Sequence, residues 1–117
     1  MKIAVCIKRV PDMETRFKIA ASGTWVDESG LKFDMSDFDG YAVEAALQIN
    51  EKQPPGETVV IALGPDVVQE SLRKAMSMGA ERAVQLKADA GIIALCNDLL
   101  FKPCVKILRE CVPLLRS

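Results

Sequence analysis

The residue types that most often carry out catalysis at neutral pH are absent or isolated in this chain. It contains no histidine, so neither a Ser-His-Asp nor a Cys-His triad can be built from its residues alone. Its cysteines, Cys6, Cys96, Cys104 and Cys111, form no C-x-x-C pair, which excludes zinc-site and thioredoxin-type spacings. We therefore expect no catalytic residue and no metal site. We interpret the cysteines as reduced thiols of a cytoplasmic protein.

Two segments could instead bind a ligand where a strand ends. Lys8 and Arg9 follow an apolar run at residues 3–7, and Gly64 follows a second apolar run at residues 58–63. Open α/β sheets bind ligands outside the carboxyl ends of their strands, where glycine allows close backbone approach and basic side chains can neutralise a phosphate. A tight turn and a solvated strand end explain the same residues without a ligand. Neither G-x-G-x-x-G nor G-x-x-x-x-G-K-[ST] is present.

The charge pattern excludes further classes of function. The net charge is -1, which argues against a generally basic nucleic-acid binder. No apolar run reaches the roughly 18 residues of a membrane span, so we expect no membrane insertion. Residues 27–44 hold six acids and one lysine, which is typical either of a docking face for a basic partner or of a solvated surface.

The elements that must position these segments alternate between strand and helix. Strands are predicted at residues 3–7, 58–63 and 83–86, separated by two helical patterns. The alternation predicts an α/β fold, a three-layer parallel sheet with helices on both faces. Short β-prone pieces at residues 17–20 and 24–26 flank a turn and predict a small hairpin insertion, and a third short strand is expected at 31–33.

Local signals predict which residues these elements bury. The first strand is expected to be buried on both faces, with Cys6 as a buried thiol. Ser36 is a suitable N-cap for the first helix, and Asp39 occupies the acidic position of a capping box. The apolar face of that helix is predicted to be Phe38, Ala42, Ala45, Ala46 and Ile49. The second helix is expected to bury Val68, Leu72, Ala75 and Met76 and to end at Gly79. The single tryptophan, Trp25, is expected to pack within the hairpin, and a contact with another subunit is the alternative.

Several blocks of the chain together resemble the electron transfer flavoprotein beta subunit family. Residues 3–12 (Ile-Ala-Val-Cys-Ile-Lys-Arg-Val-Pro-Asp) are similar to the family's first strand and the loop after it. Met-Ser-Asp-Phe-Asp at 35–39, followed by Ala-Val-Glu-Ala-Ala at 42–46, is similar to the start of its first helix. The most specific block is Ala-Leu-Gly-Pro at 62–65 with residues 70–83. The resemblance covers residues 1 to about 88.

This resemblance implies an adenine-nucleotide-hydrolase-like (HUP) fold. Because family chains are much longer, it also implies a truncated form of that fold. We expect a nucleotide-binding-like α/β domain at residues 1–88 and a helical tail at residues 89–117 that does not match the family. The tail is apolar enough to cover the open sheet edge beside the first strand or to form a dimer contact.

The family resemblance also implies a function. The chain is expected to be an electron carrier subunit and not an enzyme, paired with an electron transfer flavoprotein alpha subunit. The pair would share FAD and pass electrons from flavin dehydrogenases to an acceptor such as a quinone oxidoreductase, while the beta subunit binds AMP or a second FAD. The alternative is a structural module that has lost the nucleotide and forms a homo-oligomer.

The positions that match the family's cofactor contacts lie at the strand ends and at the start of the first helix. The implied cofactor-binding residues are Cys6, Ile7, Lys8, Phe38, Asp39, Leu63 and Gly64. Cys6, Leu63 and Gly64 would recognise the adenine through their backbones, and Phe38 matches an aromatic near the flavin ring. Met13 stands where many members have a tyrosine against the flavin, and Ser36-Asp37 replaces the common Asn-Pro.

Overall fold

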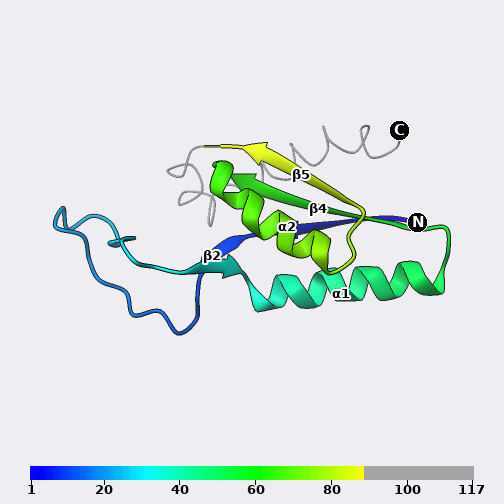
Figure 1. Cartoon of the computed structure of the whole chain (residues 1–117), viewed down its shortest axis with the longest axis horizontal. Helices are drawn as coiled ribbons and strands as arrows, with labels where there is room; N and C mark the ends of the chain where they lie inside the picture. Colours follow the sequence, from blue (N-terminus) through cyan, green and yellow to red (C-terminus); the bar gives the residue numbers. More distant parts are fainter. Residues whose placement is uncertain (89–117) are drawn as a thin grey trace.

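The computed structural model describes residues 1–88, and the predicted tail lies outside the described residues. Figure 1 shows a sheet with its helices and a long arm that projects from one end. The strands are β1 (Lys2–Ile7), β2 (Arg9–Pro11), β3 (Phe33–Met35), β4 (Glu57–Gly64) and β5 (Arg82–Lys87). The α-helices are α1 (Asp37–Lys52) and α2 (Gln69–Ser77), and a short 3₁₀ turn, η1 (Asp66–Val68), leads into α2.

The main sheet is parallel, with strand order β1-β4-β5. This arrangement confirms the predicted α/β class and the three strands of the alternating pattern. Both crossovers step across the sheet in the same direction, and right-handed crossovers of that kind place their helices on the same face. Accordingly α1 packs against β1 and β4, and α2 packs against β4 and β5 (Figure 1). A helix on the second face is not among residues 1–88.

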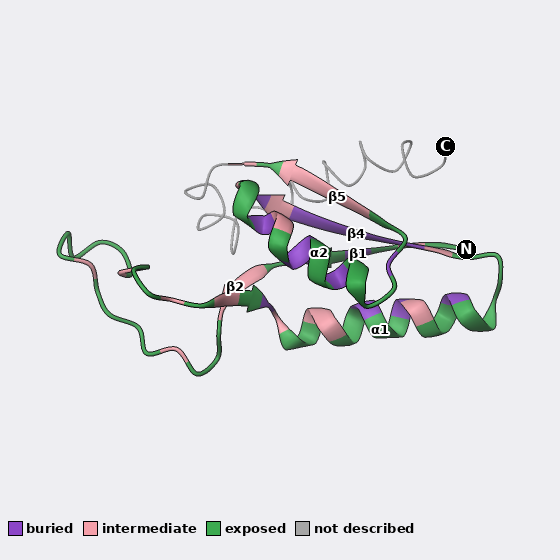
Figure 2. Ribbon diagram, in the orientation of Figure 1, coloured by how far each residue is buried: buried purple, intermediate pink, exposed green. Residues whose placement is uncertain are grey.

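The core lies between this single helical layer and the sheet. Its buried members are Val5, Ile7, Met35, Val43, Ala46, Val60, Ala62, Val68, Leu72, Ala75 and Ala80. In Figure 2 the buried positions of both helices face the strands, whereas the arm is exposed along most of its length. The prediction that β1 is buried on both faces is wrong, because Ala4 and Cys6 are exposed. In residues 1–88, β1 is an outer strand and α1 covers only the face that carries Val5 and Ile7.

The predicted apolar face of α1 is wrong except for Ala46. The helix buries Val43, Ala46 and Asn50, whereas Phe38 and Ile49 are 78% and 42% exposed. The predicted residues do recur at helical spacing, but alanines on both sides of the helix leave the rotation of the apolar face ambiguous. Asn50 decides the rotation in part, because its Nδ2 donates a buried hydrogen bond of 2.9 Å to Oγ1 of Thr58. A hydrophobicity pattern cannot anticipate such a pair.

The second helix follows its prediction more closely. Val68, Leu72 and Ala75 are buried, as expected, but Met76 is 43% exposed. Met76 follows Ala75 directly and so lies about 100° around the helix axis from it, outside the buried stripe. The helix ends at Ser77, and Gly79 follows with a φ of 125° that favours glycine.

The arm at residues 12–32 is the predicted hairpin insertion. A bridge between Ile19 and Val26 joins its two sides around a turn at Gly23. Its apolar side chains are largely exposed, including Trp25, which is 51% exposed and donates from Nε1 to Glu28. The prediction that Trp25 packs within the hairpin is therefore wrong. The base of the arm is an antiparallel ladder of β2 with β3, and the third short strand occupies 33–35 instead of 31–33.

Candidate functional site

The end of β1 is tied to the start of α1 through the backbone of Lys8. The amide of Lys8 donates to Oδ2 of Asp39 at 2.7 Å, and the carbonyl of Lys8 accepts from the amide of Ser36 at 3.4 Å. Ser36 is the N-cap residue, as predicted, but no side chain caps the helix. The carboxylate of Asp39 therefore serves the strand end instead of a capping box. The predicted residues Ile7, Lys8 and Asp39 are brought together by this connection.

The second strand end lies beside the first. The last residue pair between β1 and β4 is Ile7 with Ala62, so Leu63 and Gly64 extend beyond the end of β1. Gly64 is buried and has a φ of 154°, a backbone conformation that L side chains rarely adopt. Its carbonyl accepts from the amide of Ala88 at 3.4 Å, which ties the turn to the residue after β5.

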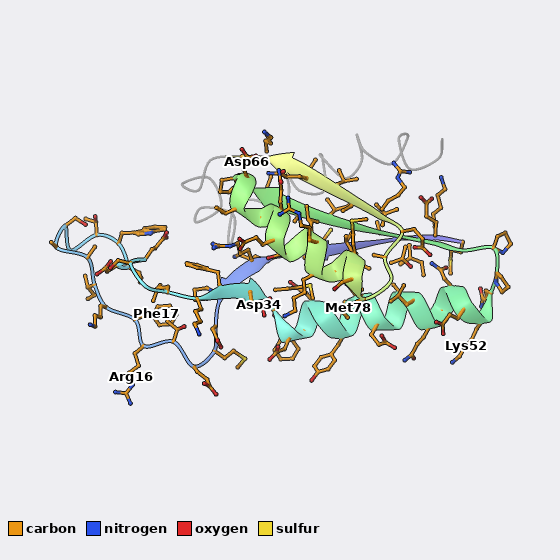
Figure 3. All side chains as sticks on the ribbon, in the orientation of Figure 1. Arg16, Phe17, Asp34, Lys52, Asp66 and Met78 are labelled. Atoms are coloured by element: carbon orange, nitrogen blue, oxygen red, sulfur yellow. The ribbon has the colours of Figure 1, made fainter. Side chains whose placement is uncertain are left out.

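A polar cluster that the sequence analysis did not identify surrounds this turn. Gln85 on β5 donates from Nε2 to the carbonyl of Gly64 at 3.3 Å and to Oδ1 of Asp66 at 3.4 Å. Asp66 pairs with Lys87 at 3.0 Å at the same end of the sheet, where Figure 3 labels it. The hydrogen bond from Lys87, followed by the charge of Lys87 and the bond from Gln85, lowers the pKa of Asp66. A glutamine near the end of a strand offers no motif that could have revealed this role.

Phe38 lies in the first turn of α1, next in sequence to Asp39. Its ring is 78% exposed and meets the ring of Tyr41 edge to face, with 6.5 Å between the centroids. Met13, on the arm, is 81% exposed. These two side chains are open to a partner or a planar ligand, and neither belongs to the buried core. The structure therefore brings together the backbone positions of the prediction, while the ring of Phe38 is exposed on the surface.

Two hollows on the surface are lined by residues other than the predicted cofactor-binding ones. One, of about 450 Å³, is lined by residues 12–18 and 27–32 of the arm and is mostly polar. The other, of about 380 Å³, lies between the start of α1 and α2, with Tyr41, Lys74 and Met78 on its walls. No predicted cofactor-binding residue lines either one.

The groups available at the predicted site are backbone groups of the strand ends and one exposed aromatic ring. Within residues 1–88 there is no group of three histidine, cysteine, aspartate or glutamate side chains suited to hold a metal. The backbone of Leu63 and Gly64 extends past the end of β1. The exposed ring of Phe38 is a suitable surface for an isoalloxazine. No helix of residues 1–88 is both long and apolar enough to cross a membrane.

Comparison with known proteins gives a consistent family assignment. The family model of the electron transfer flavoprotein domain matches residues 23–92. The electron transfer flavoprotein subunit beta of Methylophilus methylotrophus is 41% identical over 91 residues, which are 77% of this chain and 34% of the relative. The subunit beta of Dictyostelium discoideum is 33% identical over 105 residues, which are 90% of this chain and 42% of the relative. The human subunit beta is 32% identical over 87 residues, 74% of this chain and 34% of the relative.

These matches also define how much of a family protein the chain represents. It spans between about a third and two-fifths of the length of these relatives. The match of 105 residues is longer than the described segment, so similarity to the family continues past residue 88. The division of the chain at that residue remains a prediction. Because the family model covers more than half of the chain, the chain belongs to the electron transfer flavoprotein family, and the relatives that it matches are beta subunits.

Proposed function

We propose that this chain is the nucleotide-binding part of an electron transfer flavoprotein beta-type subunit. It binds AMP, or a second FAD in its place, at the carboxyl ends of β1 and β4. The observation that carries the proposal is the meeting of two backbone segments at one edge of the sheet. The backbone of Lys8 is hydrogen-bonded to the start of α1, and the last two residues of β4, Leu63 and Gly64, extend past the end of the neighbouring strand.

The second part of the proposal concerns the flavin and the partners. The subunit pairs with an alpha subunit, and the exposed ring of Phe38 contributes to the surface that holds the shared FAD. FAD supplies the redox chemistry, so the chain itself is an electron carrier subunit that positions the cofactor. Flavin dehydrogenases are its electron donors and a quinone oxidoreductase is its acceptor. We place it in the cytoplasm, on the interpretation of its cysteines as reduced thiols.

The proposal is tested by identifying bound nucleotides. The 117-residue chain is purified alone and together with a cognate alpha subunit. Nucleotides are released by denaturation and identified by mass spectrometry, and AMP is titrated into nucleotide-free protein by calorimetry. With the alpha subunit present, we expect AMP or FAD in stoichiometric amount and a yellow colour. Without the alpha subunit, we expect neither. The absence of any nucleotide from both samples, together with no heat of AMP binding, would refute the proposal.

A homo-oligomeric structural module is the second candidate function. One observation favours it: within residues 1–88, β1 pairs with β4 alone, so its other edge has no described neighbour. Edge strands of this kind template pairing between chains. Light scattering on the chain with and without residues 91–117 distinguishes this candidate. A dimer that depends on the deleted segment and carries no nucleotide supports the module, whereas a nucleotide-bound monomer excludes it.

A further inference from the structure

The side chain of Gln85 on β5 is hydrogen-bonded to the end of the neighbouring strand β4. Gln85 lies on β5 opposite Ala62 of β4, two residues before Gly64, and its side chain extends along the sheet toward the turn after β4. Three hydrogen bonds fix its amide. Nε2 donates to the carbonyl of Gly64 and to Oδ1 of Asp66, and Oε1 accepts from Nε2 of Gln69 at 3.1 Å.

The chemistry of the amide makes these bonds interdependent. A glutamine side chain has two N–H donors and one carbonyl acceptor, and here both kinds of group are used. The bond from Gln69 at the start of α2 requires Oε1 to face the helix. Nε2 must then face the carbonyl of Gly64. The side chain thus connects β5, α2 and the turn after β4, and it restrains a backbone whose φ of 154° suits glycine alone.

We propose that Gln85 is a positioning residue for nucleotide binding: its amide holds the carbonyl of Gly64 so that the backbone of Leu63 and Gly64 is presented to the adenine ring. This inference rests on the nucleotide-binding function proposed above. Gln85 acts through the turn and does not itself touch the ligand. A turn held by the side chain is preorganised, so less ordering is required when the nucleotide binds.

The sharpest test replaces one polar group by another of the same size. Gln85→Glu keeps an acceptor for Gln69 but cannot donate to the carbonyl of Gly64, and it adds a charge beside Asp66. Losing this donor is expected to weaken AMP binding about tenfold, measured by calorimetry on the full chain together with the alpha subunit. Amide hydrogen exchange at residues 63, 64 and 66 is expected to become faster in the nucleotide-free protein.

The matched control makes the same replacement elsewhere. Gln48 on α1 donates to Glu44 at 2.9 Å, so Gln48→Glu also removes a donor and places two carboxylates together, but on an exposed face of α1. We expect this variant to bind AMP as the unaltered chain does. Gln85→Leu, which adds no charge, checks that repulsion is not the cause and is expected to show the same weakening of AMP binding as Gln85→Glu.

The outcomes separate this inference from the proposed function. Unchanged AMP affinity in both Gln85 variants would overturn the positioning role, as would equal weakening in the Gln48 control. Slow, unaltered exchange at residues 63, 64 and 66 would overturn it independently of any ligand. If the unaltered chain binds no AMP even together with the alpha subunit, the nucleotide site is refuted and the binding role of Gln85 with it. The exchange measurement then decides alone whether the side chain shapes the turn.

Discussion

Gly64 connects backbone conformation to the proposed site more directly than any side chain does. Its φ of 154° lies where only glycine is unstrained. We expect Gly64→Ala to cost about 1 to 3 kcal/mol of unfolding free energy and to weaken AMP binding, because the turn must change its conformation. Chemical denaturation measures the first effect and calorimetry the second.

The control for this substitution is Gly40→Ala in α1. Gly40 has no positive φ, and an added Cβ would meet its nearest atom, Cε of Met35, at an ordinary 3.8 Å. Alanine there is expected to stabilise the protein by about 0.5 to 1 kcal/mol, because it restricts the unfolded chain. Equal destabilisation by both alanines would contradict the assignment of strain to the turn.

Asp34 gives a residue-scale prediction for pH dependence. The hydrogen bond from Lys74, and after it the backbone hydrogen bond from Met35, lowers the pKa of Asp34 below 3.8. A carboxylate with a lowered folded-state pKa stabilises the protein above the unfolded-state value, and this stability is lost as the pH falls through the folded-state pKa. The melting temperature of Asp34→Asn should therefore lie below that of the unaltered chain at pH 7 and approach it below pH 3.8. A difference that stays constant from pH 7 to pH 2.5 would refute the linkage.

At the scale of the element, α1 offers a test of which face is buried. Val43 is fully buried, so Val43→Ala is expected to cost about 2 kcal/mol of unfolding free energy from lost apolar burial and the cavity left behind. Ile49 is 42% exposed, so Ile49→Ala should cost less than about 1 kcal/mol although it removes more carbon atoms. Urea denaturation of the two variants measures both values. The opposite order would support the face that the sequence pattern predicted.

The same helix shows how far the sequence could predict the fold. The periodicity of residues 37–52 predicted a helix correctly, because spacing alone carries that information. The rotation of the helix depends on packing partners that are distant in the sequence, such as Thr58 for Asn50. The strand ends could also be predicted, because an apolar run and a glycine mark them within a few adjacent residues of the sequence. Gln85 could not be predicted, because only the parallel register places it beside Gly64.

At the scale of the whole molecule, the arm and the sheet are separate units joined by the β2–β3 ladder. Figure 3 shows Arg16 and Phe17 on the arm, well away from the sheet, and Asp34 at its base. The amide of Asp12 donates to the carbonyl of Lys32 at 2.9 Å, so residues 13–31 can be replaced by a two-residue Asn-Gly turn that closes the ladder.

We expect this shortened chain to unfold cooperatively within a few degrees of the unaltered chain, because the core contains no residue of the arm. Circular dichroism melting tests this expectation. The isolated replacement of Gly23 by valine serves as a control, since it strains the tip of the arm, where φ is 70°, without shortening it. Loss of the cooperative transition in the shortened chain alone would show that the arm supports the fold.

The ladder also has a consequence for how such proteins can diverge. Insertions and deletions between Asp12 and Lys32 change the reach of the arm while both of its ends stay paired in β2 and β3. The carboxyl ends of β1 and β4, where Lys8 and Gly64 lie, therefore keep their pairing register whatever the length of the arm. Natural variation in the arm can alter what it contacts in a lineage without any compensating change at the strand ends.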